Sequence, residues 1–88
     1  MALFFICIDS PEDGQRYSDL LTHLDLLGAK RVLSSVWALK TNNHTPTTLE
    51  HLLGSYFTGS TSGRLLIVQA ENLKWFAIQP IFDPNDLL

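Results

Sequence analysis

The chain has 88 residues, of which 45% are hydrophobic and 17% charged, and nine acidic against six basic side chains give a net charge of −3. A chain of this length supports one domain, because smaller units bury too little surface to fold alone. The apolar content excludes a disordered chain, and the acidic balance lacks the basic surplus that is typical of nucleic-acid-binding proteins. We therefore expect one folded domain over residues 1–80 and a C-terminal tail, residues 81–88.

The N-terminal part of the chain predicts a strand that leads directly into an amphipathic helix. Residues 2–9 are almost wholly apolar and end in Asp9, a pattern that is typical of a buried strand. This run is too short to span a membrane and lacks a basic leader, so we expect a cytoplasmic protein. Ser10 and Pro11 match a helix N-cap and first helical position, and Gly28 ends the helix. Its apolar face consists of Tyr17, Leu20, Leu21, Leu24 and Leu27.

The middle of the chain predicts a hairpin and a second helix. Residues 29–33 and 36–41 are rich in β-branched and aromatic side chains, and they flank residues 34–35, a serine pair that suits a tight turn. Thr45 then matches an N-cap, with Pro46 at the first helical position. The apolar face of this second helix consists of Leu49, Leu52, Leu53, Tyr56 and Phe57.

Two further strands complete the predicted fold. Residues 64–70 have an apolar centre that predicts a strand, and residues 74–79 predict a short fifth strand. The order strand, helix, strand, strand, helix, strand is that of the ferredoxin-like α+β fold, a βαββαβ sandwich with two helices on one face of an antiparallel sheet. Two short helices cannot cover all the apolar strand residues. We therefore expect a homodimer that forms through the sheet faces or through an added edge strand, with the tail packed on the partner subunit.

Asp9 and Ser35 are the candidates for catalysis. Asp9 follows a buried strand, where the carboxylates of two chains related by two-fold symmetry could share one magnesium or manganese ion and cleave phosphodiesters. The alternative for Asp9 is an ordinary turn or capping residue. The hydroxyls of Ser10 and Ser35 could likewise serve a metal-bound water or a phosphate, or simply a cap and a turn.

The remaining reactive side chains favour structural roles. Cys7 is the only cysteine and lies within an apolar run, where a thiol packs as a small hydrophobic group. The three histidines are not spaced as a zinc site. Trp37 and Trp75 lie in predicted strands, which favours a place in the core or in a dimer interface over stacking on bases.

Three short segments resemble the small CRISPR adaptation nuclease superfamily, which includes the virulence-associated protein D toxins. They are the strand that ends in Asp9, the Gly-Gln-Arg-Tyr segment that contains Arg16, and the Ser-Val-Trp segment that starts at Ser35. The resemblance covers roughly residues 2–79, and the SinR-like branch is the most similar. It implies a ferredoxin-like homodimer in which Asp9 binds a divalent metal at the dimer interface, and in which Ser34 or Ser35 matches a polar residue of the middle strand. Basic residues on the first helix and hairpin bind nucleic acid in the CRISPR branch, and here they correspond to Arg16, Lys30 and Arg31.

These observations support two main functional hypotheses and a third. The first is a non-catalytic dimeric scaffold or interaction module with a protein partner, which the acidic first helix favours. The alternative is a metal-dependent endonuclease that cuts RNA or DNA, or a toxin of that type, with Asp9 in its active site. The third is a sensor that binds a small molecule at the dimer interface.

Overall fold

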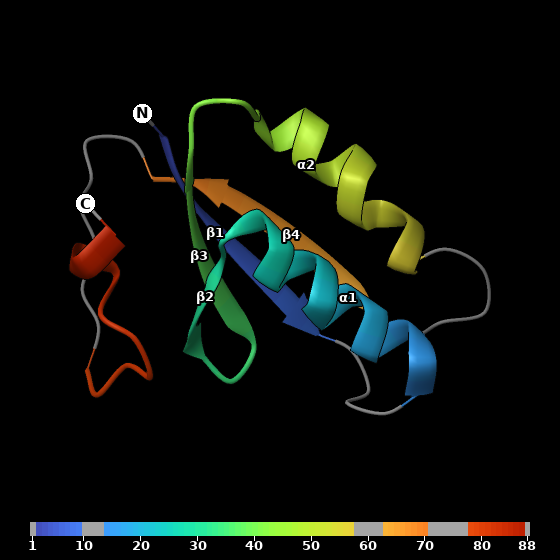
Figure 1. Cartoon of the computed structure of the whole chain (residues 1–88), viewed down its shortest axis with the longest axis horizontal. Coiled ribbons are helices and arrows are strands. Elements are labelled where there is room, and N and C mark those ends of the chain that lie inside the picture. The colour runs from blue at the N-terminus through green and yellow to red at the C-terminus, as the bar shows by residue number, and fades with distance from the viewer. Residues whose placement is uncertain (1, 10–13, 58–62, 71–77, 88) are drawn as a thin grey trace.

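A computed structural model describes residues 2–9, 14–57, 63–70 and 78–87 of the chain. Its two helices and four strands follow the predicted order (Figure 1). The elements are β1 (Ala2–Asp9), α1 (Gly14–Leu27), β2 (Lys30–Leu33), β3 (Val36–Thr41), α2 (Pro46–Leu53), the 3₁₀ helix η1 (Gly54–Phe57), β4 (Arg64–Gln69) and the 3₁₀ helix η3 (Pro84–Leu87). The helices of the described segments are all too short or too polar to cross a membrane.

The four strands form one antiparallel sheet with the order β2-β3-β1-β4. Because both β1 and β2 run antiparallel to β3, they are parallel to each other, and α1 connects them across β3. In the same way β3 and β4 are parallel, and α2 connects them across β1. Two interleaved split βαβ units of this kind define ferredoxin-like topology, so the predicted fold class is confirmed.

Helix α1 ends where the sequence predicts, at Gly28. This glycine has a positive φ of 90°, which side chains with a Cβ rarely adopt. Its N–H donates to the carbonyl of Asp25, and the N–H of Ala29 donates to the carbonyl of Leu24, both at 3.0 Å. These two bonds form a Schellman motif, so the end of the helix is set by local backbone chemistry.

Helix α2 begins as predicted and ends earlier than predicted. The side chain of Thr45 accepts a bond from the N–H of Thr48, whose hydroxyl in turn accepts from the N–H of Thr45, and Pro46 follows the cap. This reciprocal pair is a variant of the capping box. The α-helix stops at Leu53, and the last turn of the predicted helix is the 3₁₀ helix η1, which starts at Gly54.

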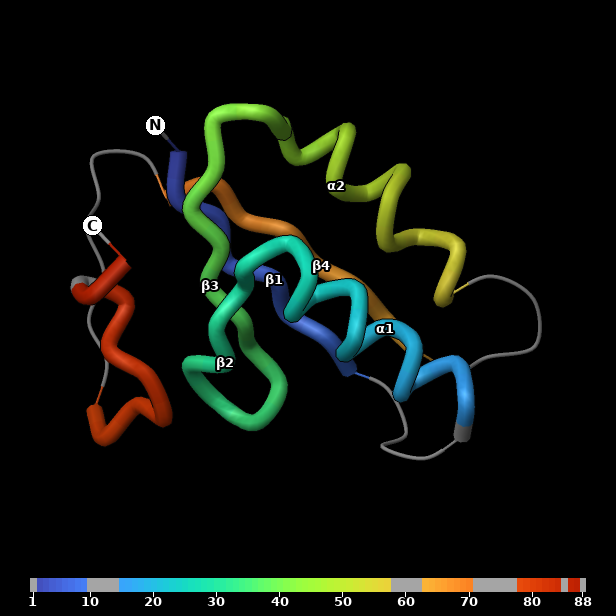
Figure 2. The backbone as a smooth tube through the Cα atoms, in the orientation of Figure 1, coloured from blue at the N-terminus to red at the C-terminus, as the bar shows by residue number. Residues whose placement is uncertain are grey.

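Both helices pack on the same face of the sheet, which we call the helix face (Figure 2). Strand β1 has an alternating burial pattern, so every second side chain enters the core beneath the helices. Trp37 on β3 is 5% exposed and belongs to this core, as predicted, whereas Trp75 lies outside the described residues. The buried members of this core are Phe4, Ile6, Ile8, Leu20, Leu24, Ala29, Trp37, Leu39, Leu49 and Leu53.

The second face of the sheet, which we call the open face, has a smaller core of its own. Leu3, Val32 and Ala38 are buried there, and Leu87 of the C-terminal tail packs against them. The N–H of Ile81 also donates to the carbonyl of Val32 at 2.7 Å, which ties the tail to β2. The tail thus contacts the sheet of its own chain, and its packing on a partner subunit stays a prediction.

The predicted fifth strand falls mainly outside the described residues. Only its last two positions, Ile78 and Gln79, are described, and they form a bend. The predicted start of the first helix, with Ser10 as N-cap, likewise lies outside them. The described part of α1 begins at Gly14, at the head of the segment on which the family resemblance rests.

Candidate functional site

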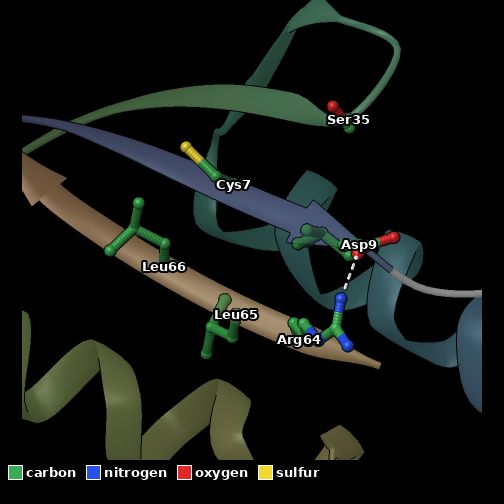
Figure 3. A pocket seen from close by; sticks show the side chains of 7 residues that line it. Cys7, Asp9, Ser35, Arg64, Leu65 and Leu66 are labelled. Carbon is green, nitrogen blue, oxygen red and sulfur yellow. Dashed lines mark hydrogen bonds and ion pairs between the residues drawn. The ribbon is translucent and has the colours of Figure 1, made fainter. Parts of the chain in front are cut away.

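The two residues predicted for catalysis lie at the same end of the sheet. Strand β1 ends at Asp9, and the hairpin turn lies beside it, where the N–H of Ile8 donates to the carbonyl of Ser35 at 2.8 Å. On the other side of β1, Asp9 stands opposite Arg64 in the antiparallel register. A shallow pocket of about 270 Å³ opens here (Figure 3). Its lining residues are Cys7, Ile8, Asp9, Ser35, Arg64, Leu65 and Leu66.

The carboxylate of Asp9 forms an ion pair with the guanidinium of Arg64. Nη1 of Arg64 lies 3.4 Å from Oδ2 of Asp9, and the dashed line in Figure 3 marks this contact. The two side chains are 78% and 83% exposed, so water screens the attraction. The pair therefore places one negative and one positive charge side by side on the pocket rim.

The described part of a single chain offers few side-chain ligands for a metal ion. Among the described residues, no three His, Cys, Asp or Glu side chains come together in a group that could hold a metal ion. Magnesium requires a near-octahedral set of oxygen ligands and binds through one or two carboxylates with several waters. The pocket offers one carboxylate, that of Asp9, and it already contacts a guanidinium. In the metal site that the sequence predicts, the second carboxylate is Asp9 of a second chain.

The three predicted nucleic-acid-binding residues do not gather on one surface. Lys30 stands opposite Ala38 in the strand register and therefore belongs to the open face, whereas Arg31 stands opposite Trp37 on the helix face. Arg16 is exposed on α1. Successive strand residues point to opposite faces, so Lys30 and Arg31 cannot contact the same stretch of phosphates through one face of the sheet.

Arg31 stabilises the hairpin from within the fold. Its Nη2 and Nε donate to the carbonyl of Ser34 at 2.7 and 3.1 Å. Nη2 also lies 3.2 Å from the hydroxyl of Tyr17, and the guanidinium carbon lies 4.8 Å from the ring centroid of Trp37. The side chain thus links the turn, helix α1 and the core, which accounts for a basic residue at this position without a nucleic acid.

Cys7 lines the pocket from the open face and is half-buried. Burial raises the pKa of its thiol above the ordinary value, because desolvation disfavours the thiolate. A reactive cysteine requires the opposite shift. The predicted role of Cys7 as a small hydrophobic side chain agrees with this environment.

An exposed apolar patch continues from the pocket along the open face. Phe5 stands opposite Val68 and Cys7 opposite Leu66 in the register of β1 and β4, so the four side chains are neighbours. Leu66 is 61% exposed and Val68 42% exposed. We call these four residues the open-face patch; Asp9 and Arg64 lie at its end.

Sequence reasoning missed Arg64, Leu66 and Val68 as site residues. The sequence did contain a signal for the last two. At the centre of residues 64–70 every side chain is apolar, so both faces of this strand carry apolar side chains. In a strand at the centre of a covered sheet both faces are buried, but β4 is an edge strand, and only its helix face is covered by α2. The sequence does not show which position in the sheet a strand occupies.

These features define the class of the protein as a small α+β domain of ferredoxin-like topology with an exposed apolar sheet face. Comparison of the chain with protein-family models, with curated proteins and with solved structures found no match. The resemblance to the CRISPR adaptation nuclease superfamily therefore stays a hypothesis that depends on the three short segments.

Proposed function

We propose that the protein is a non-catalytic, homodimeric interaction module that associates through the open-face patch. The observation that carries the proposal is the exposure of Leu66 and Val68, 61% and 42%, on the sheet face that the helices leave uncovered. They stand opposite Phe5 and Cys7 of β1, which are half-buried on the same face of the sheet. Apolar surfaces of this kind on soluble domains are sites of association.

The charges at the end of the patch favour a second copy of the chain as the partner. An interface with two-fold symmetry uses the same surface on both subunits, so that surface must complement itself. Asp9 and Arg64 supply one charge of each sign side by side. Across a two-fold axis, Arg64 of each copy can approach Asp9 of the other, and neither charge is then buried without a partner.

The chemistry of the site supports binding over catalysis. Asp9 is paired with Arg64, and burial raises the pKa of the Cys7 thiol. Lys30 and Arg31 lie on opposite faces of the sheet, and Arg31 contacts the hairpin. The Asp9–Arg64 pair and the separation of Lys30 from Arg31 favour a scaffold over a nuclease, and the raised pKa of Cys7 disfavours a thiol nucleophile.

Sedimentation velocity of the wild type and two matched variants at micromolar concentration tests the proposal. Leu66→Arg places a charge in the patch, and we expect it to sediment as a 9.9 kDa monomer, whereas the wild type sediments as a dimer. Leu26→Arg makes the same change on α1, where Leu26 is 80% exposed, and should stay dimeric. A wild type that is monomeric, or a Leu66→Arg variant that dimerises like the wild type, would overturn the proposal.

A metal-dependent nuclease is the second candidate, because Asp9 and Ser35 line the same pocket. It requires a dimer that brings the two Asp9 carboxylates together. Incubation of the purified chain with labelled RNA and DNA in magnesium or manganese tests this candidate. Cleavage that disappears in Asp9→Asn would replace the interaction module by a nuclease, and no cleavage with either metal removes the nuclease.

A further inference from the structure

The outer edge of β4 differs from the opposite edge of the sheet. β2 has only four residues, a register irregularity between Arg31 and Leu33, and the bond from Ile81 to the carbonyl of Val32. β4 has six residues in unbroken register with β1, and its charge is confined to Arg64 at one end. In the described part of the chain no segment pairs with its outer side. Exposed edges are normally protected by the kind of features that β2 has and β4 lacks.

The backbone groups on this edge belong to alternate residues. The N–H of Ala70 donates to the carbonyl of Leu3, so the backbone of Ala70 and of every second residue before it faces β1. In an antiparallel ladder the intervening residues direct their N–H and C=O groups to the other side. The groups that face outward are therefore those of Leu65, Ile67 and Gln69.

Two of these residues also line a notch on the helix face. Leu65 and Ile67 are half-buried, and together with Pro46 and Glu50 of α2 they border a space of about 180 Å³. The residues that can bind a partner backbone thus also form a pocket for one of its side chains. This combination is the one that proteins use when an extended peptide adds a strand to a sheet.

The notch has a negative charge at its border. The side chain of Glu50 is 64% exposed, and its Oε2 lies 3.6 Å from Nε2 of His51. A partner side chain next to the notch would therefore gain from a positive charge. Pairing of two β4 strands around a two-fold axis would instead bring two Glu50 carboxylates to the same side of the joined sheet, where they repel.

We infer that the outer edge of β4 binds an extended segment of another protein, with an apolar side chain in the notch and a lysine or arginine beside Glu50. The inference rests on the proposal that the chain is an interaction module, and it names the partner. It uses the edge and the helix face of β4, whereas the homodimer uses the open face. Both partners can therefore bind at once.

An amide-shift titration with a synthetic peptide tests the inference. The probe is a blocked peptide of about seven residues, made of threonine except for one valine and one lysine two positions apart, so that both lie on one face of an added strand. We expect it to shift the amide signals of Leu65, Ile67 and Gln69. The same peptide with methylated backbone nitrogens removes the donors and should shift none of them. Unchanged signals at about 1 mM peptide, or equal shifts with the methylated peptide, would overturn the inference.

Reversing the charge of Glu50 tests whether the basic residue of the partner peptide lies beside the notch. Glu50→Lys should weaken binding of the lysine peptide by about two- to fivefold, and it should favour a peptide with glutamate in place of the lysine. Asp25→Lys makes a similar change on an exposed position of α1 and should leave the affinity unchanged. Equal effects of Glu50→Lys and Asp25→Lys would contradict the assignment of the notch.

The homodimer proposal and the inference about the β4 edge can be refuted separately. Leu66→Arg is expected to be monomeric and still to bind the peptide, because the backbone of Leu66 faces β1. A wild type that dimerises but shows no shifts at Leu65 and Ile67 would refute the edge inference alone. A wild type that binds the peptide as a monomer would refute the homodimer alone.

Discussion

At the scale of single residues, the central feature is the ion pair of Asp9 and Arg64 on neighbouring strands. Its N···O distance is 3.4 Å, and both side chains are more than three-quarters exposed. Exposed pairs of this kind contribute little to folding, because water screens the charges and ordering two side chains costs entropy. In the proposed homodimer, the pair lies at the end of the open-face patch, where it would face a second subunit.

Asp9→Asn should lower the free energy of unfolding of the chain by less than about 1 kcal/mol. Urea denaturation at a protein concentration where the chain is monomeric measures this value, and Arg64→Gln should give a similar result. A loss of several kcal/mol would contradict the description of the Asp9–Arg64 pair as exposed and screened by water.

Arg31 should behave in the opposite way. Arg31→Ala removes two bonds to the Ser34 carbonyl, the contact with Tyr17 and the stacking on Trp37, so we expect a loss of about 1–2 kcal/mol in the free energy of unfolding. Lys30→Ala is the control, because Lys30 is exposed on the other face, and it should cost less than about 0.5 kcal/mol. Equal losses in the same urea experiment would contradict the structural role of Arg31.

The candidate site was only partly predictable from the sequence. Asp9 and Ser35 were identified because each follows a local pattern, the end of an apolar strand and the turn of a hairpin. Arg64 lies 55 residues from Asp9, and only the register of β1 with β4 brings the two together. Pairing between distant strands depends on the packing of the whole domain, which local patterns do not contain.

At the scale of the elements, local chemistry predicted most boundaries. Gly28 predicted the end of α1, and the Thr45-Pro46 pair predicted the start of α2. The change from α to 3₁₀ helix at Gly54 was not predicted, because the apolar spacing continues to Phe57. Side-chain periodicity alone does not distinguish a final α-helical turn from a 3₁₀ turn.

The two glycines at helix ends offer a matched test. Gly28→Ala should lower the free energy of unfolding by about 1 kcal/mol, because alanine at a φ of 90° is strained. Gly54 has a helical φ of −61°, and an added Cβ would meet only the end of the Glu50 side chain at 3.6 Å. Gly54→Ala should therefore leave the stability unchanged or raise it by about 0.5 kcal/mol.

Thermal unfolding monitored by circular dichroism compares the two glycine variants under the same conditions. The expected order of melting temperature is Gly54→Ala at or above the wild type, and Gly28→Ala below it. The reverse order would contradict the assignment of the C-cap to Gly28.

At the scale of the whole molecule, each face of the sheet has a different cover. The helices bury one face, and the tail covers part of the other with Leu87. The excess of apolar strand residues correctly indicated an open face, but part of that face is covered by the chain itself. In the open-face patch, Leu66 and Val68 on β4 stay exposed, whereas Phe5 and Cys7 on β1 are half-buried.

Both proposed binding surfaces of the molecule lie on β4. Its open face carries Leu66 and Val68 for a second copy, and its outer edge carries the backbone groups of Leu65 and Ile67 for an extended partner. Because successive strand residues alternate between faces, one strand can serve both functions without sharing a side chain.

The most direct test of the homodimer is an isotope-filtered NOE measurement on a mixture of isotope-labelled and unlabelled chains. Only contacts between two subunits give signals in this experiment. The open-face dimer predicts intermolecular NOEs to the methyl groups of Leu66 and Val68 and none to those of Leu26 on α1. Intermolecular NOEs to Leu26 without any to Leu66 and Val68, or no intermolecular NOEs at all, would contradict the account.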